Sequence, residues 1–413
     1  MADSKSKQLV RNPPSLPIRL RMNGRNIDEM HRASTPLEAL FDLTSAVAVS
    51  VAATRLYHDL LSIKSELAFV RFMLAFMAIW WPWMSFTWFS SAYDTDDVPY
   101  RISTFVQMVG VLLIAAGLPE TAAVNITGVL GFTLMRIALV ILWLRASVEH
   151  KERRVTCLRY ATATTVLQLL WIANALWIPS AWLLLTFIVL MMLEFIVPMW
   201  AAKAGETPWH PNHIAERYGF FTIILLGECM AGAASAINNI LKIQGFSLNL
   251  VVASVATVGL IMGLWWAYFL VPFTQVLRYR RERGFVWGYG HALVFAALAI
   301  LGGVLLVVAD VLIRPETQPY HLVTPVFAIA LTAATVSIFL GALWWLGGRM
   351  TQRRERSMFI VFPVWVISGL SVIFVYCGLP LDWGLLLLAC GPVVMISWVM
   401  FLRHRQPDAF AVQ

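Results

Sequence analysis

Charged residues are scarce in this chain of 413 residues. Asp, Glu, Lys and Arg together make up 13% of it, whereas a soluble globular domain has about 25%. Apolar residues make up 59%, and the mean hydropathy is +0.72. Water therefore cannot be the main solvent of this chain, and the composition predicts an integral membrane protein.

Cysteines and enzyme motifs are also sparse. The four cysteines show no CxxC spacing, which argues against a thiolate metal site and is consistent with roles in packing. The sequence has no GxSxG nucleophile motif, no Walker loop and no glycine-rich dinucleotide fingerprint. We therefore predict that the protein is not an enzyme and binds no cofactor.

Apolar stretches of about 20 residues, in contrast, recur along the whole chain. Each is long enough to cross a hydrocarbon core about 30 Å thick. We predict twelve spans, at 37–58, 67–91, 100–118, 126–146, 156–178, 181–201, 213–238, 248–271, 286–309, 321–346, 358–378 and 382–402.

The second half of the chain repeats landmarks of the first half. Trp80-Trp81 returns as Trp265-Trp266, Tyr100 as Tyr289 and Trp143 as Trp344. The basic cluster at 151–154 and the Pro-x-x-Trp string at 179–182 return at 352–355 and 380–383. The offset grows from 185 through 189 to 201 residues, as expected for a duplication with loop insertions.

Six spans in each half mean that both halves enter the membrane from the same side. The sequence thus predicts an all-α integral membrane fold with twelve transmembrane helices arranged as two parallel six-helix repeats. The expected divisions are a basic, largely disordered cytoplasmic tail at 1–33, repeats at 34–205 and 206–403, and a short tail at 404–413.

Lys and Arg gather in every second segment between the predicted spans. The richest segments are the N-terminal tail, 145–159, 278–283 and 349–356. The positive-inside rule therefore places both termini in the cytoplasm. The net charge of +8 is then a sign of contact with anionic lipid. The expected partners are the lipid bilayer and a small cation or proton, with no nucleic acid; an oligomer is compatible with the sequence.

Acidic residues inside the predicted spans are candidates for function, because an Asp or Arg at a helix centre costs about 2.5–3.5 kcal/mol on insertion scales. Glu38 and Asp42 lie one turn apart on one face of the first span. They indicate either a cation or proton site or structural carboxylates that are capped or paired with Arg. Glu228 lies beyond the middle of the seventh span, next to Gly227 and near Gly232. We predict that Asp42 and Glu228 bind or relay the ion.

Other polar residues have predicted partners. Aligning the two halves sets Glu38 against Arg217, which predicts either a salt bridge between the halves or two separate interfacial charges. His213, Glu216 and Arg217 would shape the cytoplasmic mouth with Glu38. Arg136 and Glu194 are expected to form an intramembrane ion pair, with a role in an ion pathway as the alternative.

Two clusters could suggest a metal site. Asp94, Asp96 and Asp97 have spacing that could bind a divalent cation, but they are more typical of residues that pair with Arg101 or cap the next helix. His210 and His213 lie three residues apart without other ligands around them. We therefore expect no metal.

Several of these strings resemble the bacterial low temperature requirement protein A (LtrA) family over roughly residues 33–400. They are Thr35 to Leu43, Tyr93 to Arg101, Glu194 to Pro198, Thr207 to Glu228, Trp265 to Phe269 and Tyr289 to His291. The stretch 194–228 is the most specific. One region departs from the family, because 45–54 lacks the aromatic residues and the polar Gln and His that are usual near the end of the first helix.

The resemblance implies a protein of the bacterial cytoplasmic membrane. The family name records a cold-growth phenotype and implies no molecular activity. Together with the intramembrane carboxylates, it leaves two classes of function: an ion- or proton-coupled transporter or channel, or a non-transporting membrane protein that supports envelope function or cold growth through lipid or protein contacts.

Overall fold

The computed structural model describes residues 18–27, 29, 32–62, 67–118, 126–313, 323–351 and 358–405. Within these ranges every regular element is a helix. The predicted basic positions Lys5, Lys7 and Arg11, the cluster at 352–356 and the last residues of the C-terminal tail, 406–413, lie outside the described residues.

The first half of the chain forms six long helices. These are α1 (Pro36–Leu60), α2 (Ala68–Tyr93), α3 (Val98–Gly117), α4 (Ile126–Glu149), α5 (Arg154–Trp177) and α6 (Leu183–Ala202), with the short 3-10 helices η2 (Lys151–Arg153) and η3 (Ser180–Trp182).

The second half adds seven α-helices, one of which is short. These are α7 (Pro211–Gln244), α8 (Leu248–Phe269), α9 (Phe273–Tyr279), α10 (Gly284–Ile313), α11 (Pro325–Thr351), α12 (Met358–Tyr376) and α13 (Leu381–Arg405), with η4 (Arg281–Arg283) before α10.

Ten helical segments among the described residues are long and apolar enough to cross a membrane. This finding confirms an all-helical membrane protein, and it differs from the predicted twelve spans by α5 and α12. Thr, Gln and Asn residues lower the hydropathy of α5, and the apolar part of α12 is a shorter helix, Ile360–Tyr376.

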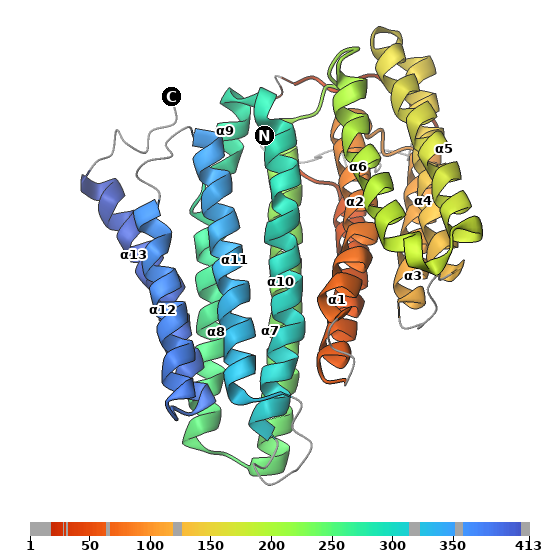
Figure 1. The fold of residues 1–413 in the computed structure, drawn as a ribbon. Helices are drawn as coiled ribbons and strands as arrows, with labels where there is room; N and C mark the ends of the chain where they lie inside the picture. The colour runs from red at the N-terminus through yellow and green to blue at the C-terminus, as the bar shows by residue number, and fades with distance from the viewer. Residues whose placement is uncertain are drawn as a thin grey trace, which may run out of the picture.

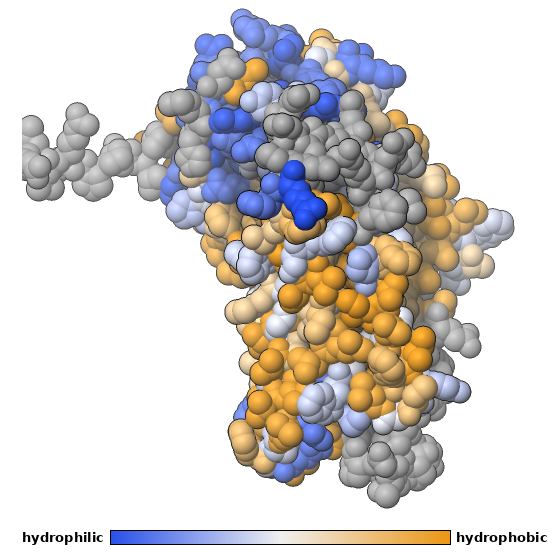
Figure 2. Space-filling model, turned by 90° about the vertical axis from the view of Figure 1, so that its left-hand side faces the viewer, coloured by the Kyte–Doolittle hydropathy of each residue, from blue (hydrophilic) through white to orange (hydrophobic). Residues whose placement is uncertain are grey.

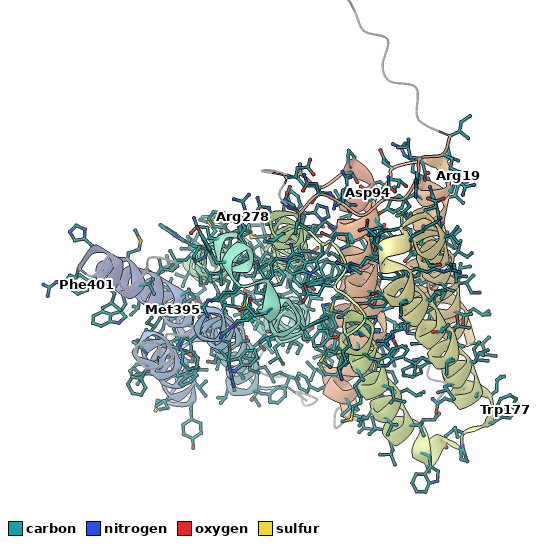
Figure 3. All side chains as sticks on the ribbon, turned by 90° about the horizontal axis from the view of Figure 1, so that it is seen from above. Arg19, Asp94, Trp177, Arg278, Met395 and Phe401 are labelled. Atoms are coloured by element: carbon teal, nitrogen blue, oxygen red, sulfur yellow. The ribbon has the colours of Figure 1, made fainter. Side chains whose placement is uncertain are left out.

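The two halves lie side by side, with α1 and α2 facing α7 and α10 (Figures 1 and 3). α1 packs against both α7 and α10, and α2 makes smaller contacts with the same two helices. We call this junction the seam. Gly303 on α10 lies so close to α1 that an added Cβ would stand 2.5 Å from the carbonyl oxygen of Ala53. The missing side chain therefore sets the distance between the helices.

Hydrophilic residues gather at one end of the bundle. Figure 1 shows α9 and the junction of α4 with α5 at the same end, and these carry the basic segments 278–283 and 145–159. Figure 2 shows hydrophilic residues at that end and apolar residues over the middle of the visible face. This distribution is typical of a helix bundle in a bilayer.

Within the predicted tail at 1–33, the structure describes residues 18–27, 29, 32 and 33, and part of this segment packs against the bundle. The backbone N–H of Met22 donates to Glu149 at 2.5 Å, and that of Leu20 donates to Asp97 at 2.8 Å. Met22 is fully buried. Residues 18–27 are held because they supply donors to two carboxylates at the ends of α3 and α4.

Candidate functional site

A buried ion pair joins α1 to α7 at the seam. Arg217 donates from Nε to Asp42 Oδ2 at 2.7 Å and from Nη2 to Asp42 Oδ1 at 2.6 Å. Trp83 Nε1 donates to the same carboxylate at 2.7 Å. Both charged side chains have no exposed surface. Asp42 is therefore paired with an arginine in this structure, which is one of the two alternatives that the sequence left open.

Glu38 lies one turn before Asp42 and also contacts Arg217. Its Oε1 is 3.2 Å from Arg217 Nη1, and its Oε2 is 3.0 Å from His213 Nε2. The structure thus contains the Glu38–Arg217 pair that the alignment of the halves predicted. Glu38 is also fixed by the start of α1, where Thr35 and Glu38 form a capping box, so its position follows from the local sequence.

Arg32 and Asp94 extend this group toward the chain segment before α1. Arg32 Nη2 lies 3.6 Å from Glu38 and 3.4 Å from Asp94. Burial raises the pKa of Asp94 to about 6, the nearby Glu38 carboxylate adds to the rise, and Arg32 offsets only part of it. We call the set Arg32, Glu38, Asp42, Asp94, His213 and Arg217 the charge cluster.

One face of α2 supplies the neutral partners of the charge cluster. Ser90 Oγ accepts from Arg217 at 3.1 Å and Thr87 Oγ1 at 3.3 Å. Trp83, Thr87 and Ser90 are four and three residues apart, so they share one face of the helix. Sequence reasoning missed these three residues and Arg32, although the helical spacing of Trp83, Thr87 and Ser90 could have indicated a polar face.

Glu216 and Glu228 lie outside the charge cluster. Glu216 accepts a hydrogen bond from the backbone N–H of Ser34 at 3.4 Å, which places it beside the start of α1. Glu228 is half-buried and accepts from Ser50 Oγ at 2.8 Å. Ser50 is eight residues beyond Asp42, about 12 Å further along α1. The two predicted ion-binding residues thus lie at different depths of the same seam.

Arg136 and Glu194 form a second buried pair, between α4 and α6. Arg136 donates to Glu194 from Nη2, and both side chains are 2% exposed. Glu194 also accepts from Trp81 Nε1 at 2.9 Å and from Trp171 Nε1 at 3.2 Å. The structure thus brings together the two residues expected to pair.

The acidic residues between α2 and α3 have partners from the protein. Asp97 caps α3 by accepting from the N–H of Tyr100, and Asp96 accepts two hydrogen bonds from Arg101, at 2.8 and 2.7 Å. Burial would raise the pKa of Asp97, but hydrogen bonds from Arg145 and two backbone N–H groups lower it to about 2.

His210 and His213, which were considered together as possible metal ligands, contact different partners. His210 caps α7 and contacts the carbonyl of Glu29 at 2.7 Å, whereas His213 contacts Glu38. Among the described residues, no group of three or more His, Cys, Asp or Glu side chains is arranged to hold a metal ion.

The composition of the charge cluster suits proton binding. Three carboxylates face two guanidinium groups, with one histidine among them. With His213 neutral and the acids ionised, the charge cluster has one negative charge in excess. A single proton makes it neutral.

Comparisons with known proteins show which family the sequence matches. The sequence model of the family described as "Bacterial low temperature requirement A protein (LtrA)" matches residues 33–400, which confirms the resemblance found from the sequence. The chain is also 25% identical over 360 residues to "Uncharacterized protein RA0937" of Rhizobium meliloti (strain 1021), an alignment that covers 83% of this chain and 81% of that protein. Neither name states a molecular activity.

Proposed function

This chain belongs to the bacterial low temperature requirement A family, and from that premise we propose that it is an ion- or proton-coupled transporter or channel. The observation that carries the proposal is the charge cluster, whose members come from α1, α7, the segment before α1 and the end of α2. Burying these groups in a bilayer is costly, and intramembrane ionisable residues commonly mark ion pathways.

In this proposal Asp42 and Glu228 bind the cation or proton at two depths of the seam. Asp42 is held by Arg217 in the arrangement described. Separation of α7 from α1 would release Arg217 from Asp42 and leave a buried carboxylate without a counter-charge. Such a carboxylate takes up a proton or a small cation. Glu38, His213, Glu216 and Arg217 would form the mouth at the basic end of the bundle.

We further propose twelve spans arranged as two parallel six-helix repeats. Neighbouring helices support this: α1–α3, α3–α4, α4–α5 and α5–α6 pack in the same order as α7–α10, α10–α11, α11–α12 and α12–α13. The seam departs from the symmetry of such repeats. α1 packs against α10. In the proposed repeats α7 corresponds to α1 and α3 corresponds to α10, but α7 and α3 are not among the main helix contacts of the described residues.

The twelve-span arrangement has a test in α5, which is the most polar of the long helices. Single cysteines would replace Glu152 and Ser180, which flank α5, in a chain without its native cysteines. If α5 crosses the membrane, a membrane-impermeant thiol reagent labels Ser180→Cys in intact cells and labels Glu152→Cys only after permeabilisation. Labelling of both from one side would contradict the proposed span, and labelling of Glu152→Cys in intact cells would contradict the cytoplasmic termini.

The transport proposal is tested by flux into proteoliposomes. The purified protein would be reconstituted, and proton, Na⁺ and K⁺ fluxes followed under imposed gradients, for the wild type, Asp42→Asn and Glu228→Gln. Glu152→Gln is the matched control, because the Glu152 side chain is 88% exposed. We expect flux in the wild type and control and at least a tenfold loss in the two variants.

Two outcomes would contradict the proposal in different ways. Absence of flux under every gradient would favour the alternative, a non-transporting protein that supports the envelope or cold growth through lipid or protein contacts. Wild-type flux in both Asp42→Asn and Glu228→Gln would leave transport intact and remove these residues from the pathway.

A further inference from the structure

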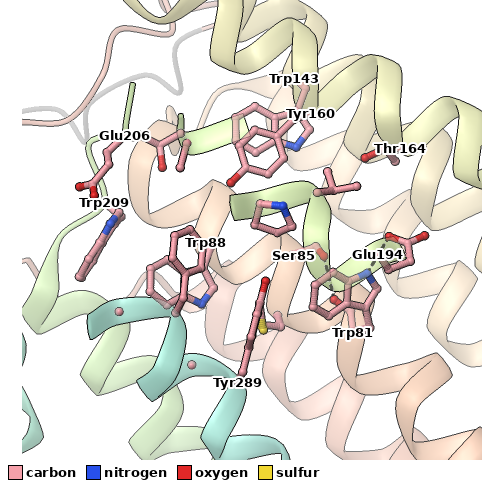
Figure 4. A pocket seen from close by; sticks show the side chains of 18 of the residues that line it. Trp81, Ser85, Trp88, Trp143, Tyr160, Thr164, Glu194, Glu206, Trp209 and Tyr289 are labelled. Carbon is pink, nitrogen blue, oxygen red and sulfur yellow. Dashed lines mark hydrogen bonds between the residues drawn. The ribbon is translucent and has the colours of Figure 1, made fainter. Parts of the chain in front are cut away.

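A second polar site lies away from the charge cluster, in a cavity between α2, α4, α5, α6 and α10 (Figure 4). Its volume is about 60 Å³, enough for a few water molecules. Figure 4 shows Glu194, the partner of Arg136, at one side of the cavity and the exposed Glu206 at the other. The exposed Glu282 also lines the cavity.

Aromatic rings are prominent among the residues that line the cavity. Four indoles and two phenols line the cavity: Trp81, Trp88, Trp143, Tyr160, Trp209 and Tyr289. Trp88 and Trp209 meet with ring centroids 4.9 Å apart, and Trp143 stacks on Tyr160 at 4.2 Å. The negatively polarised faces of such rings attract cations, and Trp attracts them best.

The charged residues that line the cavity have one negative charge in excess. Glu194 and Arg136 neutralise each other, which leaves Glu206 and Glu282 against the single guanidinium of Arg281 among the charged lining residues. That guanidinium lies 4.4 Å from the ring centroid of Trp209. The mouth of the cavity therefore already holds a cation against an indole, one supplied by the protein itself.

Two glycines of α10 bring the indole walls against the helix backbone. An added Cβ at Gly284 would lie 3.0 Å from Trp209 and 3.1 Å from Trp88, and one at Gly288 would lie 3.1 Å from Trp88. Trp88 is also fixed by a hydrogen bond from its Nε1 to the hydroxyl of Tyr218 at 3.0 Å. These contacts keep the rings in place before any ligand arrives.

We propose that this cavity binds a small alkylammonium cation, with the ammonium group among Trp88, Trp209 and Tyr289 and with Glu206 as the carboxylate nearest the mouth. Arg281 occupies part of this site and competes with the ligand. The proposal concerns equilibrium binding in the absence of any gradient, so its failure would leave the flux experiment on Asp42 and Glu228 unaffected.

The probe is choline, compared with 3,3-dimethylbutanol, which has the same shape but a carbon in place of the charged nitrogen. Binding to the purified full chain in detergent would be measured by isothermal titration calorimetry. We expect one choline site per chain and binding of the neutral alcohol that is at least tenfold weaker.

Variants locate the site. Trp209→Leu should weaken choline binding by between about twofold and thirtyfold, as expected for the loss of one cation–π contact. Glu206→Gln should also weaken it, because it removes a negative charge from the mouth of the cavity. The matched controls are Trp345→Leu, since Trp345 also has an arginine, Arg349, over its ring, and Glu152→Gln. Both controls should bind choline as the wild type does.

Arg281→Ala separates this proposal from damage to the fold, because it should tighten choline binding severalfold by removing the competing cation. Four results would each overturn the proposal: no choline binding, equal binding of the neutral alcohol, wild-type affinity in Trp209→Leu and Glu206→Gln, or weaker binding in Arg281→Ala.

The ammonium group could come from a dissolved solute or from a lipid headgroup. Repeating the titration in nanodiscs of phosphatidylcholine and of phosphatidylglycerol separates the two sources. If choline binds more weakly in the phosphatidylcholine nanodiscs than in the phosphatidylglycerol nanodiscs, the site is assigned to a lipid headgroup. Equal binding in the two kinds of nanodisc assigns it to a dissolved cation.

Discussion

Arg217 on α7 and Asp42 on α1 are 175 residues apart in the chain and form a fully buried pair with two hydrogen bonds, of 2.7 and 2.6 Å. The same chain offers a comparison outside the seam, where Arg101 binds Asp96 through two hydrogen bonds of 2.8 and 2.7 Å and both side chains are partly exposed. The two pairs have the same chemistry and differ in burial.

The first prediction compares these pairs. Arg217→Ala should destabilise the protein by about 3–5 kcal/mol, because it leaves the Asp42 and Glu38 carboxylates buried without their main counter-charge. Arg101→Ala should leave the unfolding midpoint nearly unchanged, since water screens its partner. Thermal unfolding in detergent, followed by size-exclusion chromatography after heating, measures both. Similar midpoints for the two variants would show that burial of the Arg217 pair has no energetic consequence.

The second prediction concerns a charge swap between Glu38 and Arg217. If these residues formed an isolated pair, Glu38→Arg with Arg217→Glu would restore the stability lost in each single variant. Because Arg217 also binds Asp42, a carboxylate at position 217 would face another carboxylate, and the swap should remain unstable.

Adding Asp42→Asn to the swap removes that repulsion and should raise the unfolding midpoint part of the way back to the wild-type value. The two single variants, the double variant and the triple variant would be compared in one unfolding series. Full recovery in the double variant alone would mean that Asp42 is not part of the interaction.

The third prediction is a dependence of stability on pH that arises from Asp94. Its pKa is raised from the ordinary 3.8 to about 6, so the folded protein holds a proton that the unfolded chain has released. Stability from this group is therefore greatest below about pH 4 and falls as the pH rises to 6, by on the order of 3 kcal/mol.

Unfolding midpoints measured from pH 4 to pH 7 would test this slope. Asp94→Asn should flatten the fall, whereas Asp96→Asn, which removes the partly exposed neighbour, should keep it. An unchanged slope in Asp94→Asn would assign the titration to another group.

The spans could be predicted from the sequence because hydropathy is a local property of each segment. Spans at 156–178 and 358–378 are predicted as well, and the structure has the helices α5 and α12 there, but these two are not among the ten segments that are long and apolar enough to cross a membrane. The structure of residues 18–27 was not foreseen, because their partners Asp97 and Glu149 lie far along the chain.

The charge cluster could be predicted only in part, because its members also lie far apart in the chain. Glu38, Asp42 and Arg217 are conspicuous as charges beside apolar runs, and the alignment of the two halves suggested that Glu38 meets Arg217. The alignment did not suggest Asp42 as the main partner, because one arginine can reach both turns of α1. Arg32 was counted with the basic tail, since nothing in the local sequence distinguishes a buried arginine from one that faces lipid headgroups.

The last prediction concerns the contact of α1 with α10. Gly303 faces the backbone of Ala53, where a Cβ would meet the carbonyl oxygen at 2.5 Å, whereas at the adjacent Gly302 the nearest atom is Cys229 Sγ at 3.7 Å. Gly303→Ala should therefore push the two helices apart and destabilise the protein by about 1–3 kcal/mol. Gly302→Ala should be neutral or slightly stabilising, because alanine favours a helix over glycine. Thermal unfolding of the two variants side by side gives the comparison, and equal midpoints would show that α1 and α10 are not in close contact at the seam.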